Sequence, residues 1–394
     1  MNKVIVGLQS GDEAKGKITD ALAKDATHVI RFNGANNAGH TVYAEDTKFK
    51  FHSLPSGILH PNCTNIIAAG CNVNPLELAE EIKALGDRKF NLLIDSKCHM
   101  IFPHHADVDR REEEERDEKI GTTCKGIGPS FSDKFRRNGV RLETLYTSDF
   151  YKKYHINMWD NEESGDENNG FMHDLSVAAL QKAGEVLKPY VRSDVHMRIA
   201  RASSNPDTLM LFEGAQGYQL DIDYGSYPNV SSSHPTSAGA CLGTGLAPNK
   251  VDAVLGVIKA YTSKVGSGPF PTEMDKAMGD KIRELGNEYG TTTGRPRRIG
   301  WLNLVELDEA VKVNGVTEIA LTLVDVLDTV DSIKVLTHTG YVECVGWKSE
   351  TSSIDSFGSL PLRCRNYINF ISNYLDVPVK YVSVGPGRDK LIYV

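Results

Sequence analysis

Short apolar runs alternate with amphipathic stretches along most of the chain. The apolar runs predict strands at Val4–Gly7, His28–Phe32, Asn65–Ala69, Leu92–Asp95, Leu209–Phe212, Val254–Tyr261, Glu318–Val324 and Val379–Val384. The amphipathic stretches predict helices that include Leu76–Leu85, Leu175–Leu187, Lys276–Leu285 and Leu302–Val313. Strands that are apolar on both faces and are separated by helices are typical of a parallel sheet that is covered on both sides. We therefore expect an α/β fold built on a mainly parallel sheet.

Composition narrows the class of protein. The 394 residues are 40% hydrophobic and 24% charged, as in an ordinary globular protein, and this length allows one large core with insertions or two domains. A net charge of −8 argues against a nucleic-acid polymer as a partner, because phosphate backbones are attracted by basic surfaces. No apolar run is long enough to span a membrane, and the polar start MNKVIVG is unlike a signal peptide. The seven cysteines are scattered without a C-x-x-C pair, which favours reduced thiols in a cytoplasmic protein.

Two polar segments are expected to carry no chemistry. Asp109–Lys119 (DRREEEERDEK) has opposite charges at helical spacing and is expected to be a solvated helix face, and Asp160–Gly170 is expected to be a mobile, acidic insertion. A metal site at His104, His105, Asp107 and Asp109 is an alternative, but neighbouring histidines point apart and no second cluster completes a ligand set.

A glycine-framed loop directly after the first predicted strand indicates phosphate binding. Its residues, Gly11 to Lys17, read GDEAKGK, with the G-x-x-x-x-G-K spacing that turns backbone N–H groups toward an anion at a helix N-terminus. Lys15 and Lys17 add positive charge. Position 18 is Ile, where an ordinary P-loop has a Ser or Thr for Mg²⁺, so Asp12 is the obvious carboxylate for a metal. A glycine-rich turn that merely fits the pattern is the alternative.

Four further loops follow predicted strands or helices and are rich in Gly, Thr, Arg or amide side chains. Asn33–Thr41 places His40 after a small-residue turn, where it would act as a general acid or as a hydrogen-bond electrophile. Ile120–Pro129 offers hydroxyl groups and backbone donors for a monophosphate, and Glu213–Gly217 offers an amide that would read a base edge. Thr291–Arg298 carries arginines that suit a carboxylate. Together these loops predict a site for phosphates, a base and a small dicarboxylate.

The chain resembles the adenylosuccinate synthetase family. Blocks that carry the resemblance occur in order over nearly the whole length: GLQSGDEAKGK, NNAGHT, LPSGIL, IGTTCKGIGPSFSDK, FEGAQG, LDIDYGSYPNV, VGSGPFPTE, GNEYGTTTGRPRR and SVGPGR. The resemblance implies a large twisted, mainly parallel sheet flanked by helices, with a P-loop-like nucleotide site and loop insertions. It also implies a single domain over 1–394, with an insertion or subdomain at roughly 100–200, and a homodimer.

The same resemblance implies a Mg²⁺-dependent ligase. Such an enzyme uses GTP to phosphorylate the 6-oxo group of IMP, and the amine of L-aspartate then displaces phosphate to give adenylosuccinate, GDP and phosphate. Asp12 matches the catalytic base, and His40 matches the acid that stabilises charge on the transferred group. Asp12 and the carbonyl of Gly39 match the metal ligands.

The remaining matches fall into three groups. The residues that match the family's contacts to the donor nucleotide and its phosphates are Gly11, Glu13, Ala14, Lys15, Gly16, Lys17, Gly39, Thr41, Asp325, Ser383, Gly385 and Pro386. The residues that match the family's contacts to the substrate nucleotide are Asn37, Thr122, Thr123, Arg137, Gln216, Leu220, Val265 and Gly266. Among these, Arg137 matches the arginine that reaches across the dimer interface. The aspartate loop matches Thr292, Thr293, Arg295 and Arg297.

Departures from the family pattern gather near the two bases. Ser10 replaces the usual Trp, Ala14 replaces a glycine, and Leu323 replaces the lysine of the Thr-Lys-x-Asp donor motif, while Asp325 is kept. Neutral drift is one explanation. The other is a changed substrate, as in viral relatives that convert dGMP to 2-aminodeoxyadenylosuccinate for 2-aminoadenine DNA, with ATP or dATP as an alternative donor.

A regulatory P-loop GTPase, or a nucleotide-binding module without ligase chemistry, is the alternative from a different class. It predicts Ser or Thr at position 18 and an Asn-Lys-x-Asp base motif. Ile18, Leu323 and the segment 292–297 count against it.

Overall fold

The computed structural model describes residues 1–394 apart from 45–46, 160–169, 267 and 291–293, and the side chains of 41–48 and 159–174 are also outside its description. The described chain forms a ten-stranded sheet in the order β19-β18-β15-β11-β1-β10-β2-β5-β7-β9. Its strands are β1 (Asn2–Gly7), β2 (His28–Arg31), β5 (Thr64–Ile67), β7 (Asn91–Asp95), β9 (Val191–Arg192), β10 (Met210–Gly217), β11 (Ala253–Lys259), β15 (Glu318–Thr322), β18 (Val379–Ser383) and β19 (Leu391–Tyr393). Neighbouring strands are parallel except for the pair β18–β19. The predicted mainly parallel sheet is therefore confirmed.

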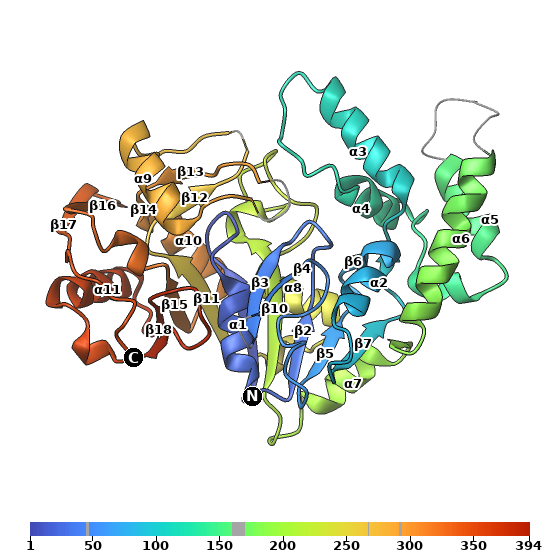
Figure 1. Ribbon diagram of the computed structural model, residues 1–394, viewed down its shortest axis with the longest axis horizontal. Helices are drawn as coiled ribbons and strands as arrows, with labels where there is room; N and C mark the ends of the chain where they lie inside the picture. Colours follow the sequence, from blue (N-terminus) through green and yellow to red (C-terminus); the bar gives the residue numbers. More distant parts are fainter. Residues whose placement is uncertain (45–46, 160–169, 267, 291–293) are drawn as a thin grey trace.

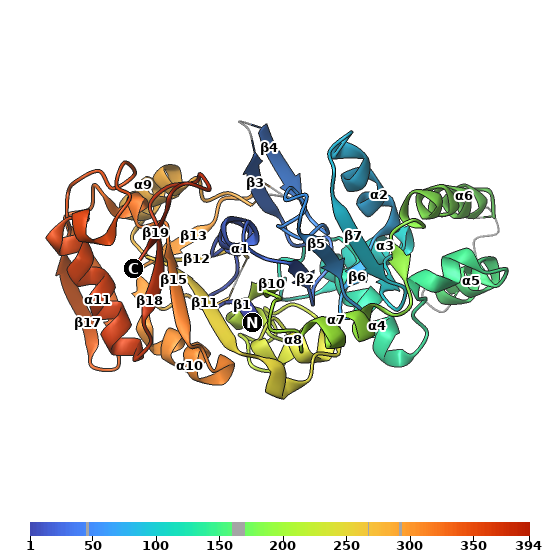
Figure 2. The ribbon, with the colours of Figure 1, turned by 90° about the horizontal axis from the view of Figure 1, so that it is seen from below.

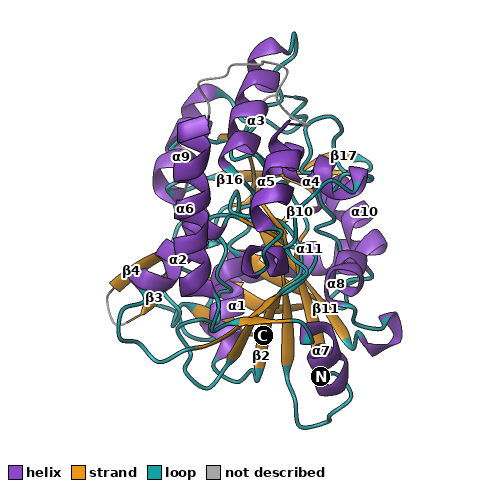
Figure 3. Ribbon diagram, turned by 90° about the vertical axis from the view of Figure 1, so that its right-hand side faces the viewer, coloured by secondary structure: helices purple, strands orange, loops and turns teal. Residues whose placement is uncertain are grey.

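Helices cover both faces of this sheet. Those of the described chain are α1 (Lys15–Ala23), α2 (Pro75–Ala84), α3 (Pro103–Glu115), α4 (Ile127–Arg136), α5 (Phe150–Trp159), α6 (Gly170–Leu187), α7 (Val195–Ala202), α8 (Ser237–Thr244), α9 (Lys276–Gly286), α10 (Leu304–Asn314) and α11 (Leu362–Leu375). Figures 2 and 3 show α2, α6 and α9 on one side of the sheet and α7, α8 and α10 on the other. The strands buried between these layers are apolar on both faces, as their sequences predict.

All eight predicted strands lie in the large sheet, and its two short outer strands, β9 and β19, were missed. Further strands form small sheets: β3 (His40–Ala44) with β4 (Thr47–Phe51), β6 (Asn72–Val73) with β8 (His99–Met100), β12 (Thr262–Lys264) with β13 (Arg298–Gly300), and β14 (Leu302–Asn303) with β16 (Ser332–Thr337) and β17 (Gly340–Val345). Those among them with two or three residues carry too little periodicity to be read from sequence, whereas β3, β4, β16 and β17 have five or six residues and were missed as well.

Two helix predictions need correction. The helix predicted at Leu302–Val313 begins only at Leu304, because Asn303 caps it by accepting from the N–H groups of Val305 and Glu306 at 3.2 and 3.3 Å. The helical part of the charged segment Asp109–Lys119 ends at Glu115, in a helix that begins at Pro103. The acidic segment Asp160–Gly170 lies outside the described residues except for Gly170, the first residue of α6.

Two hydrophobic clusters stabilise different parts of the chain. One extends over β1, β10, β11, β15 and β18 and over α10 and α11. The other joins α2, α5 and α6 to β7 and to the β4 hairpin. In Figure 1, β11, β15, β18 and α11 of the first cluster lie to the left of α1, and α2, α5, α6 and β7 of the second lie to its right.

The sheet order places four chain segments together. Strands β15, β11, β1 and β10 are consecutive neighbours in the sheet and run in parallel, so their carboxyl ends lie at one edge. Leu323 follows β15, Ala260 and Tyr261 follow β11, the predicted phosphate loop follows β1, and Tyr218 follows β10. In open α/β sheets ligands bind beyond the carboxyl ends of the strands.

Candidate functional site

The predicted phosphate loop connects β1 to α1, and a buried carboxylate organises it from within. Glu13 is fully buried and accepts hydrogen bonds from the N–H groups of Gln9 (3.1 Å) and Gly11 (2.8 Å). Gly7 makes room for this carboxylate, since a Cβ there would lie 2.3 Å from Glu13 Oε2. Asp12 has a positive φ of 59° in this loop, a conformation that Asp adopts more readily than most residues. The loop therefore presents Asp12 outward and turns Glu13 inward.

The two lysines of the loop contact protein groups in this structure. Lys15 Nζ lies 2.6 Å from Glu13 Oε2. Lys17 Nζ donates to Ser383 Oγ at 2.5 Å and also to the carbonyl oxygen of Gly385. Burial lowers the pKa of Lys17 to about 8, although the Asp325 carboxylate acts in the opposite direction. The structure thus brings Lys17 together with three residues predicted for the donor base, while Pro386 beside them is exposed.

Asp325 begins the short 3-10 helix η5 (Asp325–Leu327) after β15, and burial raises its pKa. Leu323, which stands where the family has lysine, has a positive φ of 54° and packs partly buried against the main hydrophobic cluster. Ile18 is fully buried in the core, so the position where a P-loop carries its metal hydroxyl has become part of the packing.

His40 begins β3 and lies against the first turn of α1, where a Cβ on Gly16 would be 2.8 Å from the Cβ of His40. Its Nε2 atom is buried and has no hydrogen-bond partner among the described residues. Burial, together with nearby Arg31, His52 and Lys15, holds the pKa of His40 well below its usual range. The ring is neutral near pH 7, so of the two predicted roles this environment favours a hydrogen-bond donor over a proton-donating acid. The neighbouring residue Thr41 has a side chain outside the description.

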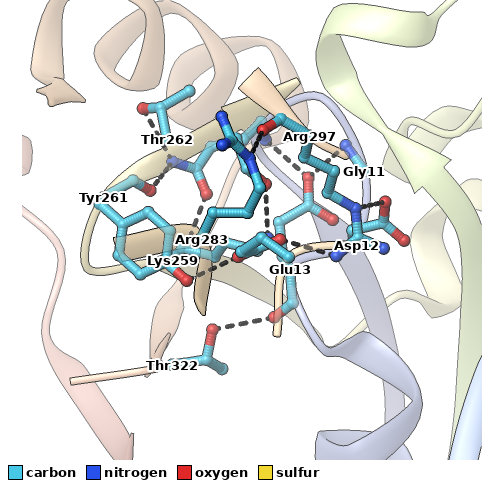
Figure 4. Close-up of polar contacts among 12 residues, drawn as sticks. Gly11, Asp12, Glu13, Lys259, Tyr261, Thr262, Arg283, Arg297 and Thr322 are labelled. Carbon is cyan, nitrogen blue, oxygen red and sulfur yellow. Dashed lines mark hydrogen bonds and ion pairs between the residues drawn. The ribbon is translucent and has the colours of Figure 1, made fainter. Parts of the chain in front are cut away.

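Asp12 belongs to a network of four charged side chains, drawn in part in Figure 4. Arg297 Nε lies 2.9 Å from Asp12 Oδ2, and Arg297 Nη1 donates to Glu288 Oε2 at 2.6 Å. The other oxygen of Glu288 accepts from Lys259 Nζ and from the hydroxyl of Tyr261, both at 2.6 Å. Burial by itself raises the pKa of Glu288, but Lys259 and Arg297 outweigh it and hold that pKa at about 2.

Arg295 and Arg297, both predicted to bind aspartate, have different surroundings in the structure. Arg297 is 8% exposed and contacts Asp12, whereas Arg295 is exposed. Thr292 and Thr293, the other residues predicted for the aspartate loop, lie outside the described residues.

The residues predicted for the substrate nucleotide gather beside the phosphate loop. Gln216 has a positive φ of 63° and donates through Nε2 to Asn37 Oδ1 at 3.2 Å. A Cβ on Gly11 would lie 3.5 Å from the side chain of Leu220. Gly266 approaches Gly121, where a Cβ would be 3.3 Å from the Gly266 Cα atom, and Val265 next to it is 40% exposed. The phosphate loop and the loops of Asn37 and Gln216 therefore meet, and the loops of Gly121 and Gly266 approach each other.

Helix α3 organises the hydroxyl-rich loop, which corrects the expectation of a merely solvated helix face. Asp109 is buried and accepts from the Thr122 hydroxyl and the Gly126 N–H, both at 2.9 Å. Glu113 accepts from the Gly121 N–H at 2.8 Å. Thr123, in the same loop, is partly exposed.

Arg137 lies apart from these residues. It is exposed, with a positive φ of 69°, at the C-terminal end of α4. Phe135, two residues earlier, is 72% exposed.

Sequence reasoning missed three buried polar residues of this site. Glu288 and Lys259 are the centre of the charged network, and each side chain is 1% exposed. Glu288 belongs to the GNEYGTTTGRPRR block, so a buried acid close to an arginine cluster was a usable signal. Asn36 is fully buried, and neither polar atom of its side chain has a hydrogen-bond partner among the described residues.

A metal cluster at His104 and His105 is not what the structure shows. His105 Nε2 lies 3.1 Å from Asp133, and His104 Nε2 lies 3.0 Å from Asn157 Oδ1. Over the described ranges, the group of three side chains close enough to hold a metal ion is instead Asp221, Asp223 and His234. The described chain also has no helix that is both long and apolar enough to cross a membrane.

Comparison with known proteins agrees with this geometry. The family model "Adenylosuccinate synthetase" matches residues 4–341 and 337–392. The adenylosuccinate synthetase of Halothermothrix orenii is 42% identical over 422 residues, which cover 99% of this chain and 98% of the relative. That of Alkaliphilus metalliredigens is 43% identical over 419 residues, with the same coverage.

Solved structures give the same result. The fully ligated adenylosuccinate synthetase of Plasmodium falciparum superposes with a TM-score of 0.92 at 33% identity, covering 100% of this chain and 99% of that one. The succinoaminodeoxyadenylate synthetase of cyanophage S-2L, bound to dGMP and dATP, reaches a TM-score of 0.67 at 21% identity and shares the fold. The chain belongs to the adenylosuccinate synthetase family of ligases.

Proposed function

We propose that the protein joins L-aspartate to IMP at the expense of GTP and releases adenylosuccinate, GDP and phosphate. The observation that carries the proposal is the position of Asp12. Its carboxylate projects from a phosphate-type loop, 2.9 Å from Arg297, and the same loop lies close to Gln216, since a Cβ on Gly11 would be 3.9 Å from the Gln216 Cα atom. A base, a phosphate cradle and a nucleotide-reading amide are therefore within one site.

The first chemical step places Asp12 as the general base. Asp12 takes the N1 proton of the purine, the electron pair moves to O6, and O6 attacks the γ-phosphorus of GTP. The bond from that phosphorus to the bridging oxygen breaks, and GDP leaves with the electron pair. His40, as a neutral ring, donates a hydrogen bond to the oxygens that gain charge.

In the second step the neutral amine of aspartate attacks C6, the C6–O6 bond breaks, and phosphate leaves with the electron pair and takes the proton that the nitrogen gives up. Phosphate is a far better leaving group than oxide, which is why the first step is needed. Arg295, Arg297 and the segment 292–293 are assigned to the aspartate carboxylates, since a guanidinium binds a carboxylate through two parallel hydrogen bonds.

Magnesium fits the donor set at the phosphate loop. The Asp12 carboxylate and the Gly39 carbonyl are hard oxygen ligands of the kind that Mg²⁺ prefers, and they would hold it. When bound, the ion neutralises charge on the phosphate oxygens of the donor.

The donor is GTP because Asp325 is present. Its carboxylate would accept hydrogen bonds from N1–H and N2–H₂ of guanine, and an adenine ring offers neither pattern. Asp325 lies partly buried beside Ser383, Gly385 and Lys17, which together make up the base pocket.

We also propose a homodimer in which Arg137 reaches the substrate phosphate of the partner subunit. Its exposure at the end of α4, next to exposed Phe135, supports this role. The chain is proposed to be one domain, with the segment of roughly 100–200 as an insertion.

The deciding experiment is phosphate release with Mg²⁺ and aspartate, crossing IMP, dGMP and GMP with GTP, ATP and dATP. Turnover that requires IMP and GTP supports the proposal. Turnover on dGMP instead would make Ser10 and Leu323 changes of specificity and would overturn the assignment of IMP. GTP hydrolysis without any acceptor would indicate the GTPase alternative.

A further inference from the structure

Asp12 is held through a chain of charged contacts that starts in the buried interior. Lys259 is the last residue of β11, and its ammonium group lies 2.6 Å from Glu288, which follows α9. Glu288 in turn holds the Nη1 atom of Arg297 at 2.6 Å, and Arg297 Nε faces Asp12 at 2.9 Å. The contacts thus run from the central sheet to the proposed base.

The backbone fixes the same geometry. The N–H of Arg297 donates to the carbonyl of Glu288 at 2.9 Å, and the carbonyl of Arg297 accepts from Arg283 Nε at 2.8 Å. The guanidinium therefore has little freedom to leave its place between the two carboxylates.

The charges of this cluster balance. Lys259 and Arg297 are positive, and Glu288 and Asp12 are negative. The first three are nearly inaccessible to solvent, whereas the side chain of Asp12 is 34% exposed. A buried charge is tolerated when it is paired and hydrogen-bonded, and removal of one partner leaves the others uncompensated.

We propose that Glu288 is a positioning residue for the reaction: it anchors Arg297, and Arg297 in turn orients the Asp12 carboxylate. This inference rests on the proposed function, in which Asp12 is the base. Glu288 holds Nη1 on one side of the guanidinium, and Nε on the other side lies 2.9 Å from Asp12 Oδ2, so the anchored guanidinium fixes which carboxylate oxygen faces it. Without the charge of Glu288 the guanidinium loses this anchor, and it no longer fixes the position of the Asp12 carboxylate.

The inference also adds a role for Arg297. The resemblance to the family places it with the aspartate loop, and its contacts place it beside the base as well. We therefore keep Arg297 with Arg295 among the residues proposed for aspartate and add the orientation of Asp12.

Glu288→Gln tests the proposal, because it keeps the shape of the side chain and removes its charge. We expect kcat to fall by about tenfold or more while the KM for IMP stays within about twofold, since a misplaced base affects turnover and leaves binding intact. The matched control is Glu273→Gln, which breaks the more exposed pair between Glu273 and Arg298, the residue next to Arg297. It is expected to change neither parameter.

A double variant separates positioning from a general loss of structure. If Glu288 acts through Asp12, adding Glu288→Gln to Asp12→Asn causes no further loss of kcat. Losses that multiply, or a folded Glu288→Gln enzyme with kcat within about twofold of wild type, overturn the proposal. If Glu288→Gln does not fold, Lys259→Met with Glu288→Gln removes a cation and an anion together and takes its place.

A crystal structure of the same variant makes the outcome independent of turnover. The proposal expects Arg297 to leave its single contact with Asp12 Oδ2, and retention of that contact overturns it. If wild type is inactive on every substrate pair, the proposed function fails, and this structure still decides whether Glu288 positions Arg297.

Discussion

The hydroxyl of Thr322, at the end of β15, donates to the backbone carbonyl of Glu13 at 2.9 Å. Thr322 is fully buried and also approaches the carbonyl of Ile258 at 3.1 Å. A single side chain thus connects the segment that leads to Asp325 with the phosphate loop. The contact therefore fixes the segment proposed to bind the donor base relative to the loop proposed to bind the donor phosphates.

Thr322→Val is expected to loosen that connection. It removes the donor and leaves the Glu13 carbonyl without this partner, which costs about 1–3 kcal/mol of stability. The KM for GTP should rise more than the KM for IMP, because the donor site contains both ends of the contact. Urea unfolding and steady-state kinetics measure the two effects, and an equal rise of both KM values would contradict the connection.

Asp12→Asn is expected to lower kcat by a factor of about 10²–10⁴, the usual contribution of a general base. Asparagine suits the test because it tolerates the positive φ of 59° at this position, which alanine would strain. The thermal midpoint should stay close to that of wild type, because the side chain is partly exposed. Residual activity above a tenth of wild type would remove Asp12 as the base.

Lys17 predicts a pH dependence of donor binding. Its pKa is lowered to about 8, so the ammonium group loses its proton as the pH rises through that value. The KM for GTP should therefore increase from about pH 7 to about pH 9, well below the usual pKa of a lysine. Lys17→Arg, whose guanidinium stays charged, should abolish this increase. A KM that is flat over this range in wild type would contradict the lowered pKa.

The surroundings of His40 predict that the pH dependence of kcat shows no titration of this ring. Because burial holds the pKa of His40 well below its usual range, kcat should show no titration of this ring between about pH 6 and pH 8, the window of an ordinary histidine. His40→Gln keeps a neutral donor and should retain more activity than His40→Ala. A kcat that decreases through this window in wild type, and is constant in His40→Gln, would show that the ring acts in its charged form.

If Arg137 acts across a dimer interface, two variants that are inactive alone should regain activity when they are mixed. Asp12→Asn and Arg137→Leu subunits are mixed, and random pairing restores about a quarter of the sites if Arg137 acts across a two-fold interface. The site restored contains Asp12 of one subunit and Arg137 of the other. Phosphate release after mixing measures this, with each variant alone as the control. No gain on mixing would place Arg137 in the site of its own subunit.

The sequence by itself determined the class of fold and most of the loops of the site. The central strands β1, β11 and β15 are apolar on both faces and short, so periodicity was sufficient to find them. The phosphate loop was evident because its glycines and lysines have a fixed spacing. Short strands such as β9, and the start of α10 after its Asn303 cap, were missed or misplaced because they depend on pairing and capping contacts.

Tertiary structure alone decided which charged residues pair with each other. Lys259 and Glu288 are 29 residues apart, and Lys17 and Ser383 are 366 residues apart, yet each pair is in contact. No local pattern encodes such a pair, because a charge has the same sequence signature whether it faces solvent or a buried partner. The order of the strands brings these residues to one edge of the sheet. Because water is excluded there, each charged group is paired with an opposite charge or a hydrogen-bonding group. Arg297 therefore lies against Asp12 in the folded chain, a contact that its sequence context did not indicate.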